Sequence, residues 1–405
     1  MSHCFRILLA GLMLTPVLGC SGDSLPANCS LTTTPLGANT LTLLADARLD
    51  RAGPGFVLLG TDGSNRVFWQ TVDVAGTAGP LQSVAVPAHT DGPWFGVVGT
   101  AAAPGNQVVV TFAANPTGGM ASLLSFAVGI DGTMATSPAA IGMIPDRAAT
   151  AAALLVSAGS GQGGQHMGLM WATKGSSTVS AKILGPGGAQ VGGDVSLGTV
   201  DDIDCPRFAS GRGDLTATFV RTSGTPPIRT FAAREFDTDG KPAPGLDLQL
   251  LDWSADEAMG CVAVAPSTSG YGFGWRANSN SFSGDYFALY DPAAGVSVPT
   301  QILSDERVSG GHASPVVALG KVGAGLVDRF IVVIAQTTGG QAWEVDFRGH
   351  PIAQSVTFPS TRGNTGTFSA QPLGGSLFVT YADYSSALGT DHSQGSRLFA
   401  EVTCK

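Results

Sequence analysis

The sequence predicts an all-β fold, a seven-bladed β-propeller with four strands in each blade, and three observations support this prediction. The first is composition: 56 of the 405 residues are Gly and only 13% are charged. Such a chain has many turn residues and few of the charged residues that cover helix surfaces. The second is a turn that recurs at a nearly constant interval. The third is an apolar strand that recurs along the whole chain.

The recurring turn follows an apolar strand and is rich in Asp and Gly, as in "TVDVAG", "AVGIDG" and "EFDTDG". Its glycines are Gly76, Gly132, Gly188, Gly240, Gly295 and Gly349, which stand 52 to 56 residues apart. Glycine supplies the positive φ that a tight hairpin needs. The spacing indicates one structural unit of about 55 residues.

The recurring strand precedes that turn and carries a bulky residue near its end. The bulky residues are Leu59, Phe112, Trp171, Phe219, Trp275, Ile334 and Tyr381, which makes seven repeats. The seventh repeat stops at "RLFAEVTCK", before its own turn and last strand. A strand from elsewhere must therefore complete the last sheet.

The fourth repeat shows the four strands most clearly. They read "CPRFASG" at 205–211, "LTATFVRT" at 215–222, "IRTFAAREFD" at 228–237 and "LDLQLLD" at 246–252. Turns of Gly, Pro, Asp and Ser separate them, and no stretch keeps a helical period over three turns. Four-stranded sheets repeated radially form a β-propeller.

The N-terminus has the features of an export signal. Residues 7–19, "ILLAGLMLTPVLG", are too short to span a bilayer but fit the core of a signal peptide. "VLGC" at 17–20 resembles the bacterial lipobox. The resemblance implies cleavage before Cys20 and a diacylglycerol on its sulfur, with a lipoprotein signal peptide at 1–19, a short tether at 20–28 and the propeller at 29–405. The alternative is an ordinary secretory signal with an incidental cysteine.

The residue after the lipobox cysteine bears on location. It is Ser21 and not the Asp that often retains such lipoproteins in the inner membrane, so an outer-membrane location, on the periplasmic face or the cell surface, is expected. The whole chain resembles a bacterial lipoprotein with a propeller ectodomain. No blade signature identifies a particular family.

The cysteines of the exported part predict two disulfides, because their number is even. Residues 39–46, "NTLTLLAD", are expected to complete the last blade, which brings Cys29 and Cys404 together as the clasp of the ring. Cys205 and Cys261 stand at equivalent places in adjacent blades and form the second expected pair. For that second pair, two separate buried thiols are the alternative.

The loops that join the outer strand of one blade to the inner strand of the next concentrate the charge of a charge-poor chain. A mixture of carboxylates, Arg and Trp at one mouth of the channel suits a polar ligand such as a glycan or a peptide. The alternative is that these loops only keep a Gly-rich protein soluble. The candidate residues are Asp91, Trp94, Asp146, Arg147, Asp202, Asp204, Trp253, Asp256, Glu257, Asp305, Glu306, Arg307, His312 and Arg362.

The remaining chemistry narrows the expected function. The net charge of −9 and the lack of a Lys/Arg run argue against nucleic acid as a partner. The scattered His residues form no metal-ligand spacing, no nucleophile motif is present, and we expect no metal and no cofactor. "DTDG" at 237–240 is interpreted as a hairpin turn and not as a calcium loop.

The expected function is a lipid-anchored binding or scaffold module of the cell envelope. It would dock a protein, a peptide or a glycan on one propeller face, with the membrane as its second partner through the anchor. The alternative is a polysaccharide-active hydrolase or lyase that uses carboxylates at the channel mouth. A structural stalk or lattice protein is a third possibility.

Overall fold

The computed structural model describes the strands and many of the turns of the chain. The described residues are 29–36, 47–61, 66–86, 97–103, 106–145, 154–160, 166–173, 178–199, 202–210, 215–225, 228–243, 246–248, 258–259, 262–266, 270–278, 283–291, 296–297, 301–304, 316–322, 327–336, 339–345, 351–385 and 395–404. Within these ranges no helix is long and apolar enough to cross a membrane. The regular structure of the described residues is β, apart from the 3-10 turn η2 (Pro186–Gly188), so the all-β prediction is confirmed.

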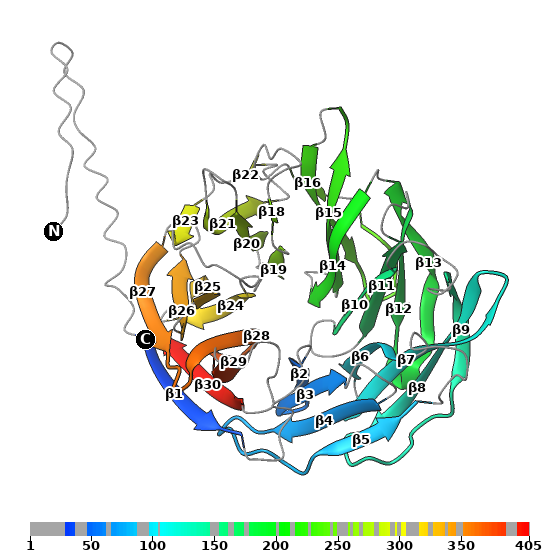
Figure 1. The fold of residues 1–405 in the computed structure, drawn as a ribbon, viewed down its shortest axis with the longest axis horizontal. Coiled ribbons are helices and arrows are strands. Elements are labelled where there is room, and N and C mark those ends of the chain that lie inside the picture. The colour runs from blue at the N-terminus through cyan, green and yellow to red at the C-terminus, as the bar shows by residue number, and fades with distance from the viewer. Residues whose placement is uncertain are drawn as a thin grey trace, which may run out of the picture.

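The strands pair in seven antiparallel sheets, which follow one another around a central axis (Figure 1). Sheets 1 to 4 are built from strands that are consecutive in the chain. Sheet 1 contains β2 (Arg48–Ala52), β3 (Gly55–Thr61), β4 (Arg66–Val72) and β5 (Gln82–Ala85). Sheet 2 contains β6 (Val97–Ala103), β7 (Gln107–Thr117), β8 (Met120–Gly129) and β9 (Ala139–Pro145). Sheet 3 contains β10 (Leu154–Ser160), β11 (Met167–Thr173), β12 (Thr178–Leu184) and β13 (Gln190–Thr199). Sheet 4 contains β14 (Asp202–Ser210), β15 (Leu215–Ser223), β16 (Ile228–Phe236) and β17 (Leu246–Leu248).

Of the other three sheets, sheet 6 is also built from four consecutive strands, whereas sheets 5 and 7 differ. Sheet 5 contains six strands, β18 (Ala258–Met259), β19 (Ala263–Pro266), β20 (Tyr271–Asn278), β21 (Ser283–Asp291), β22 (Val296–Ser297) and β23 (Gln301–Ser304). Sheet 6 contains β24 (Val316–Val322), β25 (Val327–Gln336), β26 (Gly339–Val345) and β27 (Pro351–Phe358). Sheet 7 contains β28 (Gly363–Leu373), β29 (Ser376–Ser385), β30 (Ser396–Cys404) and β1 (Cys29–Pro35).

Sheet 5 departs from the expected four strands. Both β18 and β19 pair with β20, and both β22 and β23 pair with β21. The inner and outer positions of this sheet are therefore each occupied by two short segments, although the order of positions is the same as in its neighbours.

The ring is closed by the start of the chain. β1 pairs antiparallel with β30 in a continuous register, with Cys29 opposite Cys404 and Pro35 opposite Leu398 (Figure 1). The closing strand is thus 29–35, where we expected 39–46, and 37–46 lie outside the described residues. Leu31 contributes to the apolar cluster between sheets 6 and 7, and the β-branched run Thr32–Thr34 suits a strand.

The core lies between the sheets and is divided among clusters that each join two sheets neighbouring in the chain. Leu59 and Phe112 share one cluster between sheets 1 and 2, and Ile331 and Tyr381 share another between sheets 6 and 7. A further cluster joins sheet 1 to sheet 7, where the ring of Phe56 lies 4.9 Å from that of Phe378. All seven bulky residues that mark the repeats are buried, at 0 to 6% exposure.

The turn glycines are confirmed where the structure describes them. Gly76, Gly132, Gly188 and Gly240 have φ of 81°, 91°, 80° and 72°, whereas Gly295 and Gly349 lie outside the described residues. Each turn also packs on the preceding sheet. A Cβ on Gly240 would lie 2.7 Å from the backbone oxygen of Val191 in sheet 3. These positions therefore need glycine both for the backbone angle and for the close approach.

The same contact is repeated at the ring closure. A Cβ on Gly76 would lie 2.9 Å from Cβ of Thr34 in β1 and 3.1 Å from the ring of Phe399 in β30. The first sheet therefore docks its turn on the last sheet in the way that the fourth docks on the third. Strand pairing of the N-terminal segment supplies the surface on which this turn packs.

Candidate functional site

The predicted binding end of the molecule carries the loops that lead from an outer strand to the next inner strand. Most of the candidate side chains lie outside the described residues, namely Asp91, Trp94, Asp146, Arg147, Trp253, Asp256, Glu257, Asp305, Glu306, Arg307 and His312. Asp202 and Asp204 fall in β14, where only their backbone is described. Arg362 is the member of the set whose side chain is described, and it is exposed.

Of the cysteines predicted to be lipidated or disulfide-bonded, some lie outside the described residues. Cys20 and Cys261 lie outside the described residues. The backbone of Cys205 lies in β14, and the backbone of Cys404 lies in β30, directly opposite Cys29.

The loop 359–362, between β27 and β28, is fastened by the carboxylate of Asp383 in β29. Ser360 Oγ donates to Asp383 Oδ1 at 2.8 Å, and Thr361 Oγ1 donates to Oδ2 at 2.6 Å. The backbone amides of Thr361 and Arg362 donate to the same carboxylate at 3.0 and 3.2 Å. Because Asp383 is only 1% exposed, these four bonds give a buried charge its partners.

A buried tyrosine in β29 also hydrogen-bonds to this loop. Tyr381 Oη donates to the backbone oxygen of Pro359 at 3.1 Å. Burial raises the pKa of Tyr381, and the negative charge of Asp383 raises it further, so the phenol remains a donor over the physiological range. Arg362 is thus carried by a loop whose backbone is hydrogen-bonded at Pro359, Thr361 and Arg362.

A buried ion pair lies at the corresponding end of sheet 5, the end of the outer-to-inner loops. Arg276 and Asp285 are directly opposite in β20 and β21, and the guanidinium donates through Nε to Oδ1 and through Nη2 to Oδ2, both at 2.8 Å. They are 4% and 1% exposed. Asn278, two residues on, pairs with Ala258, which follows the loop 249–257. The ion pair therefore lies close to Ala258, where the described chain enters sheet 5.

Sequence reasoning did not identify Asp383, Arg276 or Asp285. Each is a charged residue within an apolar strand, and this pattern could have marked it as a buried charge with a partner. Their partners, however, are fixed by strand pairing and by a loop about twenty residues away, and a local pattern does not contain that information.

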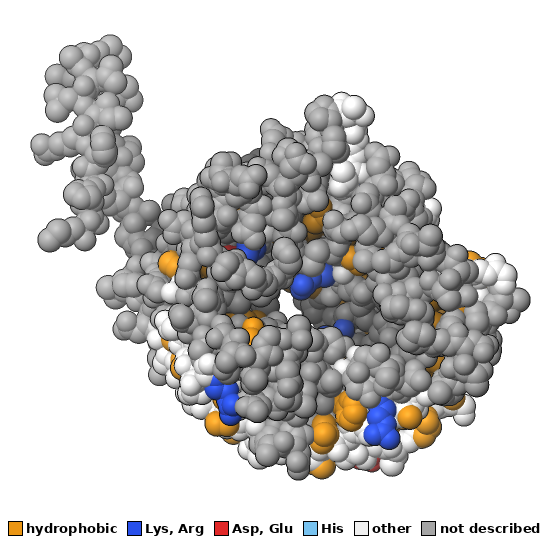
Figure 2. Space-filling view, viewed as in Figure 1, with side chains coloured by type: hydrophobic (Ala, Val, Ile, Leu, Met, Phe, Trp, Pro, Cys, Tyr) orange, Lys and Arg blue, Asp and Glu red, His pale blue; other side chains and the backbone are white. Residues whose placement is uncertain are grey.

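The middle of the molecule has a central opening, and Lys and Arg side chains lie at its edge in the view of Figure 2. Among the residues that the structure describes, no group of three or more His, Cys, Asp or Glu could hold a metal ion. The "DTDG" segment forms a turn in which Asp237 Oδ1 accepts the backbone amides of Asp239 and Lys241 at 2.9 and 2.8 Å. Its first carboxylate is therefore used within the turn.

Comparison with known proteins rests on fold alone. No family model matches the chain, and no curated protein matches it. Among solved structures, the polysaccharide lyase Uly1 is similar with a TM-score of 0.52 at 10% identity, over 91% of each chain. A prolyl endopeptidase is similar with a TM-score of 0.43 at 13% identity. This chain covers 46% of it and so spans about half its length. The hydrazine synthase of Kuenenia stuttgartiensis has a TM-score of 0.49 at 13% identity, over 86% of this chain and 95% of that one. The likeness indicates that the small antiparallel sheets belong to a propeller-like fold.

Proposed function

We propose that this chain is a seven-bladed propeller, lipid-anchored at Cys20 in the outer membrane of a bacterial envelope, whose outer-to-inner loop end docks an envelope protein, peptide or glycan. The observation that carries the binding proposal is the loop 359–362, which presents exposed Arg362 while Asp383 holds the loop backbone. A loop needed only for solubility has no reason to be fixed by four hydrogen bonds to a buried carboxylate.

The energetic argument is one of pre-organisation. A long side chain on a freely moving loop loses conformational entropy when a ligand orders it, whereas a loop already fixed loses less. Arg is also suited to bind carboxylates and phosphates in a bidentate way, and its guanidinium hydrogen-bonds to polar ligands. The buried pair of Arg276 and Asp285 supports the same end of sheet 5.

The covalent clasp remains part of the proposal. Directly opposite residues of an antiparallel pair have Cα atoms about 4.5 to 5.5 Å apart, and disulfides span about 4.4 to 6.8 Å. The register that places Cys29 opposite Cys404 therefore supports a disulfide between them. The pair of Cys205 and Cys261 is proposed on repeat position alone.

Binding can be tested with two matched variants. Arg362→Ala removes an exposed cation from the outer-to-inner loop end, and Lys241→Ala removes one from the β16–β17 turn, at the opposite end of the strands. The probes are a glycan array and the peptides and proteins of an envelope extract. We expect a bound species whose affinity falls about tenfold (about 1.4 kcal/mol) in Arg362→Ala and is unchanged in Lys241→Ala. Equal binding by both variants would contradict a site at this end.

The anchor has its own test. Mass spectrometry of the N-terminal peptide should find a diacylglycerol on Cys20, and Cys20→Ala should release the chain from the membrane fraction. A mature chain that begins at another residue without lipid would contradict the anchor, and it would leave the binding proposal untouched.

The same experiments also test the alternative that the protein is a polysaccharide-active enzyme. A polysaccharide-active enzyme needs two carboxylates facing each other across a cleft, at about 5 to 10 Å. The two buried carboxylates described at this end are engaged, Asp285 by Arg276 and Asp383 by the loop 359–362. If a glycan bound on the array is depolymerised, the protein is an enzyme and the proposal of a binding module is wrong.

A further inference from the structure

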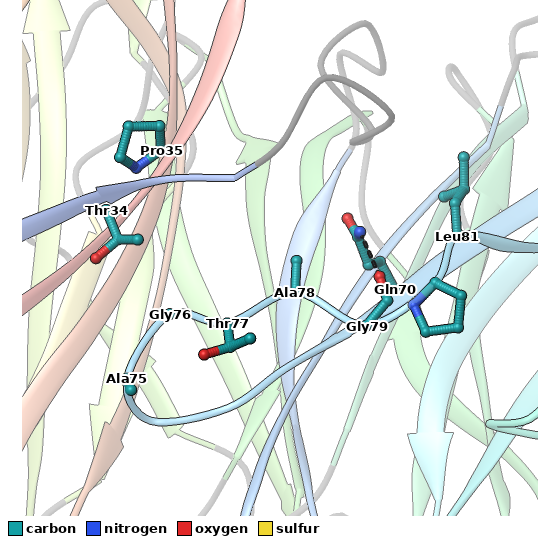
Figure 3. Close-up of a pocket in the computed structure, with 10 residues that line it drawn as sticks. Thr34, Pro35, Gln70, Ala75, Gly76, Thr77, Ala78, Gly79 and Leu81 are labelled. Atoms are coloured by element: carbon teal, nitrogen blue, oxygen red, sulfur yellow. Dashed lines mark hydrogen bonds between the residues drawn. The ribbon is translucent and has the colours of Figure 1, made fainter.

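A cavity of about 480 Å³ lies at the outer rim where the ring closes, between the end of β1 and the turn that joins β4 to β5 (Figure 3). Its lining comes from Thr34 and Pro35, from Gln70 in β4 and from residues 75–81. This volume falls within the range of about 300 to 1,000 Å³ that ligand pockets occupy. All the described lining residues are uncharged, which suits a neutral ligand.

The turn that forms one wall is held rigidly. Asp73 Oδ1 accepts the backbone amides of Ala75 and Thr77 at 2.9 and 2.7 Å. The amide of Gly79 donates to the oxygen of Thr71 at 2.8 Å. The wall therefore keeps its shape without a ligand.

Thr34, Thr77 and Gln70 are the polar side chains of the described lining, and that of Gln70 is buried, at 5% exposure. Its Nε2 donates to the backbone oxygen of Gly79 at 2.7 Å. Its Oε1 is turned away from Gly79 (Figure 3) and has no hydrogen-bond partner among the described residues. A buried acceptor without a partner is unfavourable by about 1 to 3 kcal/mol, and a ligand that donates an N–H to it would remove that cost.

Among the described strands, the one that forms the other wall lies at the edge of its sheet. β1 is the last strand of sheet 7. It pairs with β30 on one side, and no described strand pairs with it on the other. A free strand edge can pair with an extended peptide through the backbone. Pro35 has no N–H, so pairing ends there, at the mouth of the cavity. Leu81, 38% exposed, gives the cavity an apolar side for one side chain.

We propose that this cavity and the edge of β1 together form a second binding site, which takes an extended polypeptide segment. The segment would pair with β1, leave the edge at Pro35, donate one backbone N–H to Gln70 Oε1 and place a small apolar side chain against Leu81. A saccharide is disfavoured because the described lining has no aromatic ring to stack on a sugar and no charged side chain.

The test uses linear heptapeptides displayed on phage and selected against the purified full-length protein, followed by calorimetry with the synthetic peptides. Gln70→Met keeps the volume and removes the acceptor, and Leu81→Ser removes the apolar wall. Met143→Ser is the control, because Met143 is also an exposed hydrophobic residue, 44% exposed, but does not line the cavity. Melting curves establish that each variant is folded.

We expect affinity to fall about tenfold in Gln70→Met and in Leu81→Ser and to be unchanged in Met143→Ser. Methylation of the peptide nitrogens should weaken binding at alternate residues, since alternate N–H groups face the partner strand. Failure to enrich any peptide, or equal affinity for all variants, would overturn the proposal. A dimer in sedimentation that Leu81→Ser abolishes would assign the site to a second copy of the chain and would also overturn it. Neither outcome depends on Arg362, so this test is independent of the one for the loop end.

Discussion

The repeated turn makes a quantitative prediction about one glycine. Gly240→Ala adds a methyl group at a residue with φ of +72° and places it 2.7 Å from the backbone oxygen of Val191, which belongs to the preceding sheet. The left-handed backbone region is unfavourable for Ala by about 1 to 2 kcal/mol. Overpacking against a fixed neighbour is unfavourable by about 1 to 3 kcal/mol more. The free energy of unfolding should therefore fall by about 2 to 5 kcal/mol.

A control variant, Gly374→Ala, separates the cost of the left-handed backbone from the cost of overpacking. Gly374 has φ of +62° in the turn between β28 and β29, and a Cβ there meets nothing within 4 Å. Gly374→Ala thus carries the backbone term alone, about 1 to 2 kcal/mol. The difference between the variants measures the contact between sheet 4 and sheet 3.

Urea denaturation of the two variants and the wild type, followed by tryptophan fluorescence, gives both free energies. We expect Gly240→Ala to be the less stable by about 1 to 3 kcal/mol. Equal losses would refute the packing argument, because the glycine would then be needed only for its backbone angle.

Three further predictions concern charge and the clasp. Asp383→Asn should reduce stability by about 2 to 4 kcal/mol in urea denaturation, because a neutral amide cannot accept the four hydrogen bonds of the loop 359–362; unchanged stability would contradict that role. Reduction, or Cys404→Ser, should lower the melting temperature through loss of the proposed bond to Cys29, with an upper limit on the order of 6 kcal/mol for so long a loop; unchanged melting after verified reduction would contradict the clasp. Hydrogen bonds from Thr77 first, and from Ala75 as well, lower the pKa of Asp73 from 3.8. Its stabilisation is therefore complete above about pH 4 and lost as the pH falls through the lowered value. Melting curves should show a difference between wild type and Asp73→Asn at pH 7 that shrinks as the pH is lowered below about 4.

The fold was predictable to the extent that it depends on short-range pattern. A turn glycine and a bulky buried residue recur in each unit, and both are dictated locally, by the φ that a hairpin needs and by alternation along a strand. The strands expected for the fourth repeat, 205–211, 215–222, 228–237 and 246–252, overlap β14 to β17. Sheet 5 was harder, because its inner and outer segments are short and interrupted.

The closing strand shows why register is harder than strand content. The pattern of the fourth repeat favoured 39–46, since a Pro/Gly segment precedes it as one precedes β17. The register instead begins at Cys29, where Leu31 can reach the cluster between sheets 6 and 7. A shift of one residue would exchange the buried and exposed faces, so tertiary packing decides between candidates that sequence pattern leaves equal.

The cavity at the rim follows from the same break in the repeat. Gly132 in sheet 2 docks on Gln82, in the fourth strand of sheet 1, which the chain has just left. Gly76 docks instead on Thr34, in a strand supplied by the beginning of the polypeptide, whose far end is the ring-closing proline. The surface at this seam is thus built from two segments that are not joined through a short turn. A binding site there would involve only β1 and one turn.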